Sequence, residues 1–411
     1  MPTKSFLIAA AFASLTATGC GSGGSATTAD YKHPAVVVAI PKEGPLAHLG
    51  RDAERAARMQ FEARTKSGFL GALRLVTVDE AEKSAPYIDP EKVAQRTQEQ
   101  VDSGTVVAWV GGIDSDAVAV ELPRLNEAGI IAVSPSATAT PFNLRDPAFP
   151  GAPIKYFPAF AKFGLTFART APTDLTLGRG CLASLAKQRL VRVFTVDAGD
   201  TDGDSFSSAV QSQAPLVGGE LVGHESVSTS SADWDGLSRQ IANSKAQVII
   251  WGSAISGVES EFWASLKQAG VSVPVLFGTA MPPTELARLP SSIPTSSVCS
   301  ASAPAETLGV QGPRFAQDFK RRWGHAPAAG SLRGAAAMAL ALKALEQASG
   351  EAGTEAGLEA SRAATALRLS RISRFDSLLG PMELSPVGNW NQAPIGMWQL
   401  SAGRAVFRQV R

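Results

Sequence analysis

The chain lacks the common signatures of catalysis. No Gly-x-Ser-x-Gly elbow and no phosphate-binding P-loop occurs, and the Ser-x-x-Lys tetrapeptide at residues 184–187 stands without its companion motifs. The histidines are few and scattered, without the spacing of a metal site: His33, His48, His224 and His325. We therefore expect a protein that is not an enzyme and that needs no cofactor and no metal ion.

An excess of charge of either sign is also missing. The 38 basic and 37 acidic side chains leave a formal net charge of +1. A balance near zero argues against a nucleic-acid partner or an anionic membrane surface. No apolar run approaches the length needed to cross a bilayer. At 411 residues the chain is long for one domain and suits two lobes.

Cysteine is scarce, with 3 in the chain, and the first of them follows an export signal. Lys4 and an apolar core over residues 6–15 are typical of a signal peptide, here residues 1–19. The run Ala17-Thr18-Gly19-Cys20 resembles a bacterial lipobox. We expect a lipid on Cys20 and a flexible tether over residues 20–34. The alternative is a plain secretory signal with an incidental cysteine.

Two short apolar runs carry the most information about fold and site. Residues 106–110 and 130–133 are too short for helices, and their continuous apolar character is typical of strands buried on both faces. A helical pattern over residues 117–126 lies between them. Each strand ends in a loop of small, hydroxyl-bearing residues. Ligands of open α/β sheets bind beyond the carboxyl ends of the strands, so the pattern predicts a site for a small polar molecule.

The same residues carry a family resemblance. Trp109-Val110-Gly111-Gly112-Ile113-Asp114-Ser115 and Val133-Ser134-Pro135-Ser136-Ala137-Thr138 resemble the ligand-binding half of the periplasmic leucine-isoleucine-valine-binding proteins. Further anchors are Gly44-Pro45-Leu46-Ala47, Arg169-Thr170 with Asp174, and Gly380-Pro381. The resemblance implies an α/β, two-lobed type I periplasmic-binding-protein fold, in which each lobe is a parallel sheet flanked by helices. A hinge of three strands would join the lobes.

The alternation of strand and helix patterns sets the expected lobes. We expect residues 35–169 with 303–377 in the first lobe and residues 170–302 with 378–411 in the second, with the third crossing near 378–380. Cys181 and Cys299 both fall in the second lobe. In an exported protein they either form a disulfide or are buried small side chains.

The resemblance also implies how a ligand is held. Its α-carboxylate would meet backbone N–H groups and hydroxyls at Ser115, Ser136, Ala137 and Thr138, with Leu49 lining the pocket nearby. Successive N–H groups at a loop or helix start bind an anion without a basic residue. The alternative is a pair of ordinary β–α turns in which Ser136 or Thr138 merely caps a helix.

The second half of the family's clamp is altered here. The family binds the ligand's ammonium with a tyrosine and a glutamate, and the matching stretches hold Ala254 and Ala280 instead. The acidic loop 197–204 is either a solvated turn with a helix N-cap at Asp204, or it supplies Asp200 or Asp202 to a ligand's cationic group. Its resemblance to a calcium loop lacks two of the required acids. Trp251 either lies in the core or faces the ligand.

These observations lead to one function and one alternative. We expect a substrate-binding lipoprotein of the cell envelope that captures a small carboxylate- or amide-bearing ligand, an amino acid or a derivative, between its lobes. It would act as a monomer and deliver the ligand to an inner-membrane ABC permease. The alternative is an outer-membrane lipoprotein of the same fold that regulates a protein partner or senses a ligand.

Overall fold

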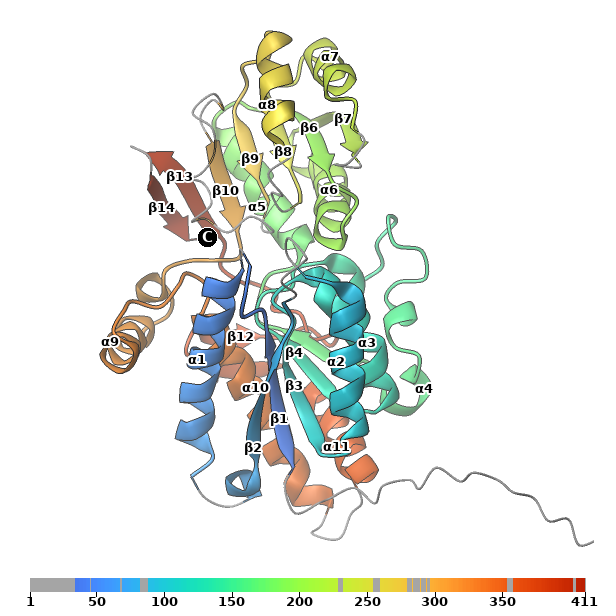
Figure 1. The fold of residues 1–411 in the computed structure, drawn as a ribbon, viewed down its shortest axis with the longest axis vertical. Coiled ribbons are helices and arrows are strands. Elements are labelled where there is room, and N and C mark those ends of the chain that lie inside the picture. Colours follow the sequence, from blue (N-terminus) through green and yellow to red (C-terminus); the bar gives the residue numbers. More distant parts are fainter. Residues whose placement is uncertain are drawn as a thin grey trace, which may run out of the picture.

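A computed structural model describes most of the chain. The residues it describes are 34–44, 46–66, 69–81, 88–227, 232–253, 259–278, 283, 289, 293, 296–352, 358–401 and 404–410. They form two lobes, which lie one above the other in Figure 1. The signal peptide, Cys20 and the tether lie outside the described residues, as do Pro45, Ala254 and Ala280.

The first lobe is built on a parallel sheet with the strand order β2-β1-β3-β4-β5. Ala108 pairs with Ile131, so the two apolar runs singled out in the sequence are adjacent parallel strands, as predicted. Every residue of β1 and β3 is buried, because helices cover both faces of the sheet. The strands are β1 (Ala35–Ile40), β2 (Arg74–Asp79), β3 (Val106–Gly111), β4 (Ile131–Ser134) and β5 (Phe167–Arg169).

Successive residues of β1 face different helix layers. Val36 and Val38 pack in the same core as α1 (Ala47–Arg64), α10 (Leu332–Ala352) and α11 (Leu358–Arg371). Val37 and Ala39 pack instead with α3 (Ser115–Glu127), beside which lies α2 (Pro90–Asp102). Short α4 (Phe160–Phe163) and α9 (Gly312–Trp323) complete this lobe. This is the alternation of faces expected of a central strand.

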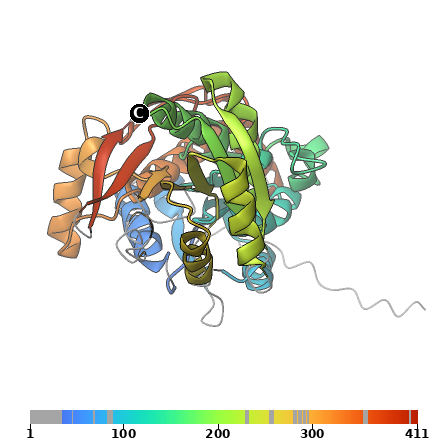
Figure 2. The same ribbon diagram turned by 90° about the horizontal axis from the view of Figure 1, so that it is seen from above.

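The second lobe has a mixed sheet with the order β14-β13-β10-β9-β8-β6-β7, in which β13 and β14 are antiparallel. Figures 1 and 2 place β13 and β14 on the same side of the molecule as α9. The strands are β6 (Arg192–Asp197), β7 (Glu220–Ser226), β8 (Val248–Trp251), β9 (Val275–Phe277), β10 (Ser296–Ser300), β13 (Gly396–Ser401) and β14 (Arg404–Val410). The helices are α5 (Asp174–Lys187), α6 (Thr201–Gln213), α7 (Trp234–Ser244) and α8 (Glu259–Gln268).

The chain passes between the lobes after β5, after β10 and before β13. The last of these passages lies later in the chain than residues 378–380, where we expected it. The antiparallel hairpin of β11 (Arg374–Ser377) and β12 (Gly380–Glu383) stays with the first lobe, because its apolar side chains pack into that core. The apolar residues that do so extend to Ala393: Phe375, Leu379, Met382, Leu384, Trp390 and Ala393.

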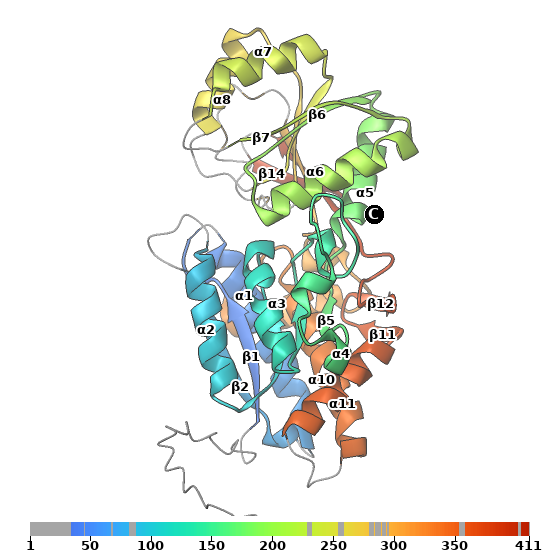
Figure 3. The ribbon, with the colours of Figure 1, turned by 90° about the vertical axis from the view of Figure 1, so that its right-hand side faces the viewer.

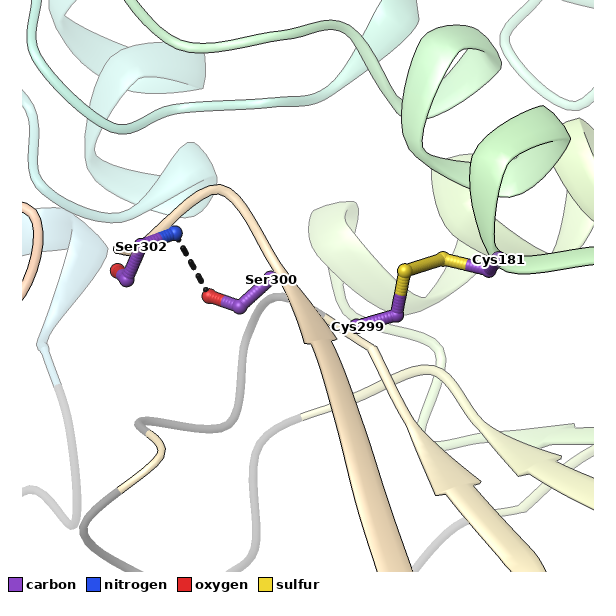
Figure 4. Close-up of a disulfide and its surroundings, with 4 residues drawn as sticks. All are labelled: Cys181, Cys299, Ser300 and Ser302. Carbon is purple, nitrogen blue, oxygen red and sulfur yellow. Dashed lines mark hydrogen bonds between the residues drawn. A yellow bond between two sulfur atoms is a disulfide. The ribbon is translucent and has the colours of Figure 1, made fainter. Parts of the chain in front are cut away.

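The two cysteines of the second lobe form a disulfide. Cys181 of α5 and Cys299 of β10 are both fully buried, and their Cα atoms are 5.9 Å apart (Figure 4). Of the two alternatives that the sequence left open, a disulfide or two buried thiols, the structure shows the disulfide. Within the described part of the chain, none of the helices has both the length and the apolar character to pass through a bilayer.

Candidate functional site

The loops after β3 and β4 are tied together by serine hydroxyls. Ser134 Oγ donates to Gly112 O at 2.7 Å and accepts from the N–H groups of Ala137 at 2.9 Å and Ser136 at 3.3 Å. Ser136 Oγ donates to Ile113 O at 2.5 Å. The structure therefore places Ser136 and Ala137 beside the loop that follows β3. The Ser136 hydroxyl and both N–H groups form hydrogen bonds within the first lobe.

The start of α3 faces the start of α6 across the two lobes (Figure 3). The Ser115 N–H donates to Asp202 Oδ2 at 3.4 Å, and the Thr201 N–H donates to Asp116 Oδ1 at 3.0 Å. Each helix thus receives a carboxylate of the other at its N-terminus, where the helix dipole favours negative charge. Asp202 thus accepts from an N–H group, that of Ser115, which the family resemblance expects to bind a ligand's carboxylate.

Further hydrogen bonds hold the lobes in contact. Thr140 N–H donates to Ser205 Oγ at 2.9 Å, and Ser208 Oγ donates to Asp146 Oδ1 at 2.6 Å. Both join the loop region after β4 to α6. The two lobes are therefore in direct contact where α3 and the loop after β4 meet α6.

Carboxyl groups gather at this closed contact and raise one another's pKa. Burial, followed by the charge of Asp114, raises the pKa of Asp202 well above its usual value. Burial raises the pKa of Asp200 to about 6, and Asp116 on the opposite lobe adds to the rise. Because part of each shift comes from the other lobe, closure favours uptake of protons.

A second acidic group lies deeper, at the first residue of α5. Asp174 is fully buried, and its N–H donates to Thr138 O at 2.8 Å. The hydroxyls of Ser205 and Thr138 lie close enough to the Asp174 carboxylate to lower its pKa, but the two carboxylate oxygens and the Thr138 hydroxyl form no hydrogen bond of good geometry with a described residue. Burial raises the pKa of Asp174 to about 6. The nearby hydroxyls of Ser205 and Thr138 and the positive charge of Arg169 act in the opposite direction and lower this pKa. Buried acceptors without donors are costly, and a ligand's N–H group would satisfy them.

The Arg169 side chain holds the loop that follows β4. Its Nη1 donates to Ala137 O at 3.1 Å and to Ala139 O at 2.9 Å, and its Nη2 donates to Asn143 Oδ1. The side chain is fully buried, and burial lowers its pKa to about 9. The sequence singled out Arg169 and Asp174 only as markers of the fold. Their burial at the junction of the lobes is what makes them candidates for the site.

The remaining candidates lie in different surroundings. Leu49, half-buried on α1, packs against the first-lobe core. Trp251 is fully buried, with its ring centroid 5.8 Å from that of Phe262 and 5.9 Å from that of Trp263. Of the two alternatives for Trp251, it therefore lies in the core. In the acidic loop, Asp200 and not Asp204 is the N-cap of α6, since it accepts from Gly203 N–H at 2.6 Å. Among the described residues, no three acidic, histidine or cysteine side chains are grouped to hold a metal ion.

Two lobes, a multi-segment hinge and polar loops that meet between two largely parallel sheets are the features of a ligand-binding protein of the periplasmic type. A family model described as "Periplasmic binding protein" matches residues 35–404, so the chain belongs to this family. It is a family of binding proteins and not of enzymes. No curated protein matches the chain.

Solved structures share the fold at low sequence identity. An ABC transporter substrate-binding protein from Desulfitobacterium hafniense, in complex with Leu, is 18% identical with a TM-score of 0.69, covering 92% of this chain and 100% of its own. The leucine-binding protein LivK from Thermotoga maritima is 16% identical with a TM-score of 0.71, covering 92% and 98%. A solute-binding protein from R. palustris in complex with benzoate is 18% identical with a TM-score of 0.67, covering 92% and 95%.

Proposed function

We propose that this chain is the substrate-binding component of an ABC-type uptake system and captures a small carboxylate- or amide-bearing ligand between its lobes. The observation that carries the proposal is the Ser115 N–H at the start of α3, which lies 3.4 Å from a carboxylate oxygen of Asp202. A ligand's carboxylate or carbonyl oxygen would take the place of Asp202. The structures similar in fold include complexes with Leu and with benzoate, which are both small carboxylates.

The other end of the ligand would meet Asp174 and Thr138. Asp174 is buried at the junction of the lobes, and its carboxylate has no hydrogen bond of good geometry among the described residues. An amide N–H or an ammonium group supplies such a donor. Since the second lobe has Ala254 and Ala280 in place of the family's tyrosine and glutamate, we expect a ligand without a free amine but with an N–H donor, 4-methylpentanamide, to bind at least as well as leucine.

Calorimetry with leucine, 4-methylpentanoate and 4-methylpentanamide tests the ligand class. Thr138→Val removes a hydroxyl that forms no hydrogen bond of good geometry with a described residue, so we expect the fold to survive and affinity to fall roughly ten- to a hundredfold. Thr195→Val is the matched control, because Thr195 is equally buried and its hydroxyl also lacks a described partner, but it lies within β6. Equal losses in both variants would argue against a role for Thr138 in binding.

A second experiment separates transport from a regulatory role. A wider thermal-shift screen over amino acids, amides and short organic acids should find a compound that stabilises the chain by about 3 kcal/mol at roughly 100 times its Kd. If no compound stabilises the protein and a pull-down recovers a periplasmic enzyme instead, the protein-binding regulator becomes the better interpretation.

We also propose that Cys20 carries a lipid that holds the protein at the cell envelope. The buried Cys181–Cys299 disulfide supports export, because disulfides persist in oxidising compartments. Membrane fractionation of the wild type and Cys20→Ala tests the anchor. We expect the wild type in the membrane fraction and the variant in the soluble fraction, and equal partition would contradict lipidation.

A further inference from the structure

One side chain bonds to all three passages between the lobes. Arg333 is the second residue of α10, and its Nε donates to Ala301 O at 2.8 Å, just after β10. Its Nη2 donates to Pro394 O at 2.9 Å, just before β13. Its Nη1 donates to Thr170 O, just after β5. One guanidinium therefore holds a carbonyl from each passage.

The Arg333 guanidinium is buried and charged, and main-chain carbonyls are its hydrogen-bond partners. Only 1% of the residue is exposed, and burial lowers the pKa of its guanidinium to about 9, so it is still protonated at neutral pH. Among the described residues no acidic side chain lies within ion-pairing distance of it. The three carbonyls take the place of a counter-ion, and a planar fork of donors can bind all three at once.

The tie continues into the loops of the candidate site. Thr170 Oγ1 donates back to Arg333 O at 3.1 Å, and Thr170 N–H donates to Ser134 O at 3.0 Å. The hydroxyl of Ser134 orders the N–H groups of Ser136 and Ala137. Arg333 itself is held in place, because α10 packs into the first-lobe core from Leu332 onward.

We propose that Arg333 is a positioning residue of the hinge: it fixes the three passages relative to one another and limits how far the lobes open. Rotation of one lobe shifts the passages against each other, and a shared guanidinium resists that shift. The inference rests on the hinge alone and holds for any ligand.

Arg362 of α11 provides a matched control. It is 9% exposed, and its Nε and Nη2 donate to Val106 O at 3.0 and 2.8 Å, while its Nη1 donates to Ala128 O at 3.2 Å. Like Arg333, it is a buried arginine bonded to main-chain carbonyls. Unlike those of Arg333, these bonds join parts of the first lobe to one another, so the loss of Arg362 measures the cost of removing a buried arginine away from the hinge.

The test compares Arg333→Met, Arg333→Lys and Arg362→Met by hydrogen–deuterium exchange and small-angle X-ray scattering. In Arg333→Met we expect amides of residues 170–173, 301–304 and 392–395 to exchange at least about tenfold faster, and the radius of gyration to increase. Arg333→Lys keeps the charge but loses the fork, so its exchange should be intermediate.

The control variant should speed exchange near Val106 and Ala128 and leave the passages and the scattering curve unchanged. If Arg333→Met does not fold, the comparison is made between Arg333→Lys and Arg362→Lys. Exchange in the passages that is no faster in the Arg333 variants than in the Arg362 variants, with superimposable scattering curves, would overturn the proposal.

Discussion

Asp174→Asn should make this protein more stable at neutral pH. Asp174 is fully buried at the start of α5, and burial raises its pKa from 3.8 to about 6. Keeping it ionised in the folded protein therefore costs free energy. Asparagine has the same shape without the charge, and its amide can donate to a neighbouring hydroxyl oxygen.

The size and the sign of the effect follow from the pKa shift. A rise of about 2 units corresponds to roughly 3 kcal/mol. Below pH 3.8 the carboxyl is protonated in both the folded and the unfolded states, so Asp174 contributes no difference. Between 3.8 and about 6 the folded state retains a proton that the unfolded state has lost, so wild-type stability falls as the pH rises. Above that range the full penalty applies.

Urea unfolding followed by tryptophan fluorescence, from pH 3.5 to 7.5, measures this difference. We expect Asp174→Asn to match the wild type near pH 3.5 and to exceed it by about 1–3 kcal/mol at pH 7. Asp376→Asn, on an exposed position of β11, is the control and should follow the wild type throughout. Parallel curves for the wild type and Asp174→Asn would refute the reasoning.

Two further predictions concern the lobes. Replacing both Cys181 and Cys299 by serine should lower the free energy of unfolding by about 3–5 kcal/mol, measured by urea denaturation, because the bridge spans a separation of 118 residues. A loss below about 1 kcal/mol would contradict it. Acidification from pH 7 to 5 should favour the closed lobes, since Asp114 and Asp116 on one side raise the pKa of Asp202 and Asp200 on the other. The radius of gyration of the wild type should therefore decrease as the pH is lowered from 7 to 5, and that of Asp202→Asn should change less. If the radius of gyration depends on pH in the same way in both proteins, the carboxyl groups do not link protonation to lobe closure.

The sequence predicted those features that a local pattern encodes. Residues 106–110 and 130–133 could be read as doubly buried, neighbouring strands because continuous apolar runs of that length have few other uses. The predicted boundary at residue 378 divided the hairpin and gave β12 to the second lobe, because strand patterns do not say which of two cores receives a strand. Leu379 and Met382 decide that point through contacts with residues far away in the chain.

The site was harder to predict than the fold. The clustering of Ser115, Ser136, Ala137 and Thr138 follows from adjacent strand ends, but the hydrogen bonds of Ser134 depend on the three-dimensional course of both loops. Asp174 is buried, and Arg333 bonds to three distant segments, because of the way in which the two lobes meet. The spacing of residues along the sequence does not encode how the lobes meet.

The disulfide also changes how the second lobe is connected as a polymer. Because Cys181 and Cys299 are joined, the chain between them is a closed covalent ring that contains α6 to α8 and most of the sheet. Cleavage of a single peptide bond inside that ring opens it without separating the protein into two pieces. A protease must therefore cut twice within the ring, or cut where the bridge is reduced, before any part of the ring can leave, whereas β13 and β14 lie outside the ring and have no such protection.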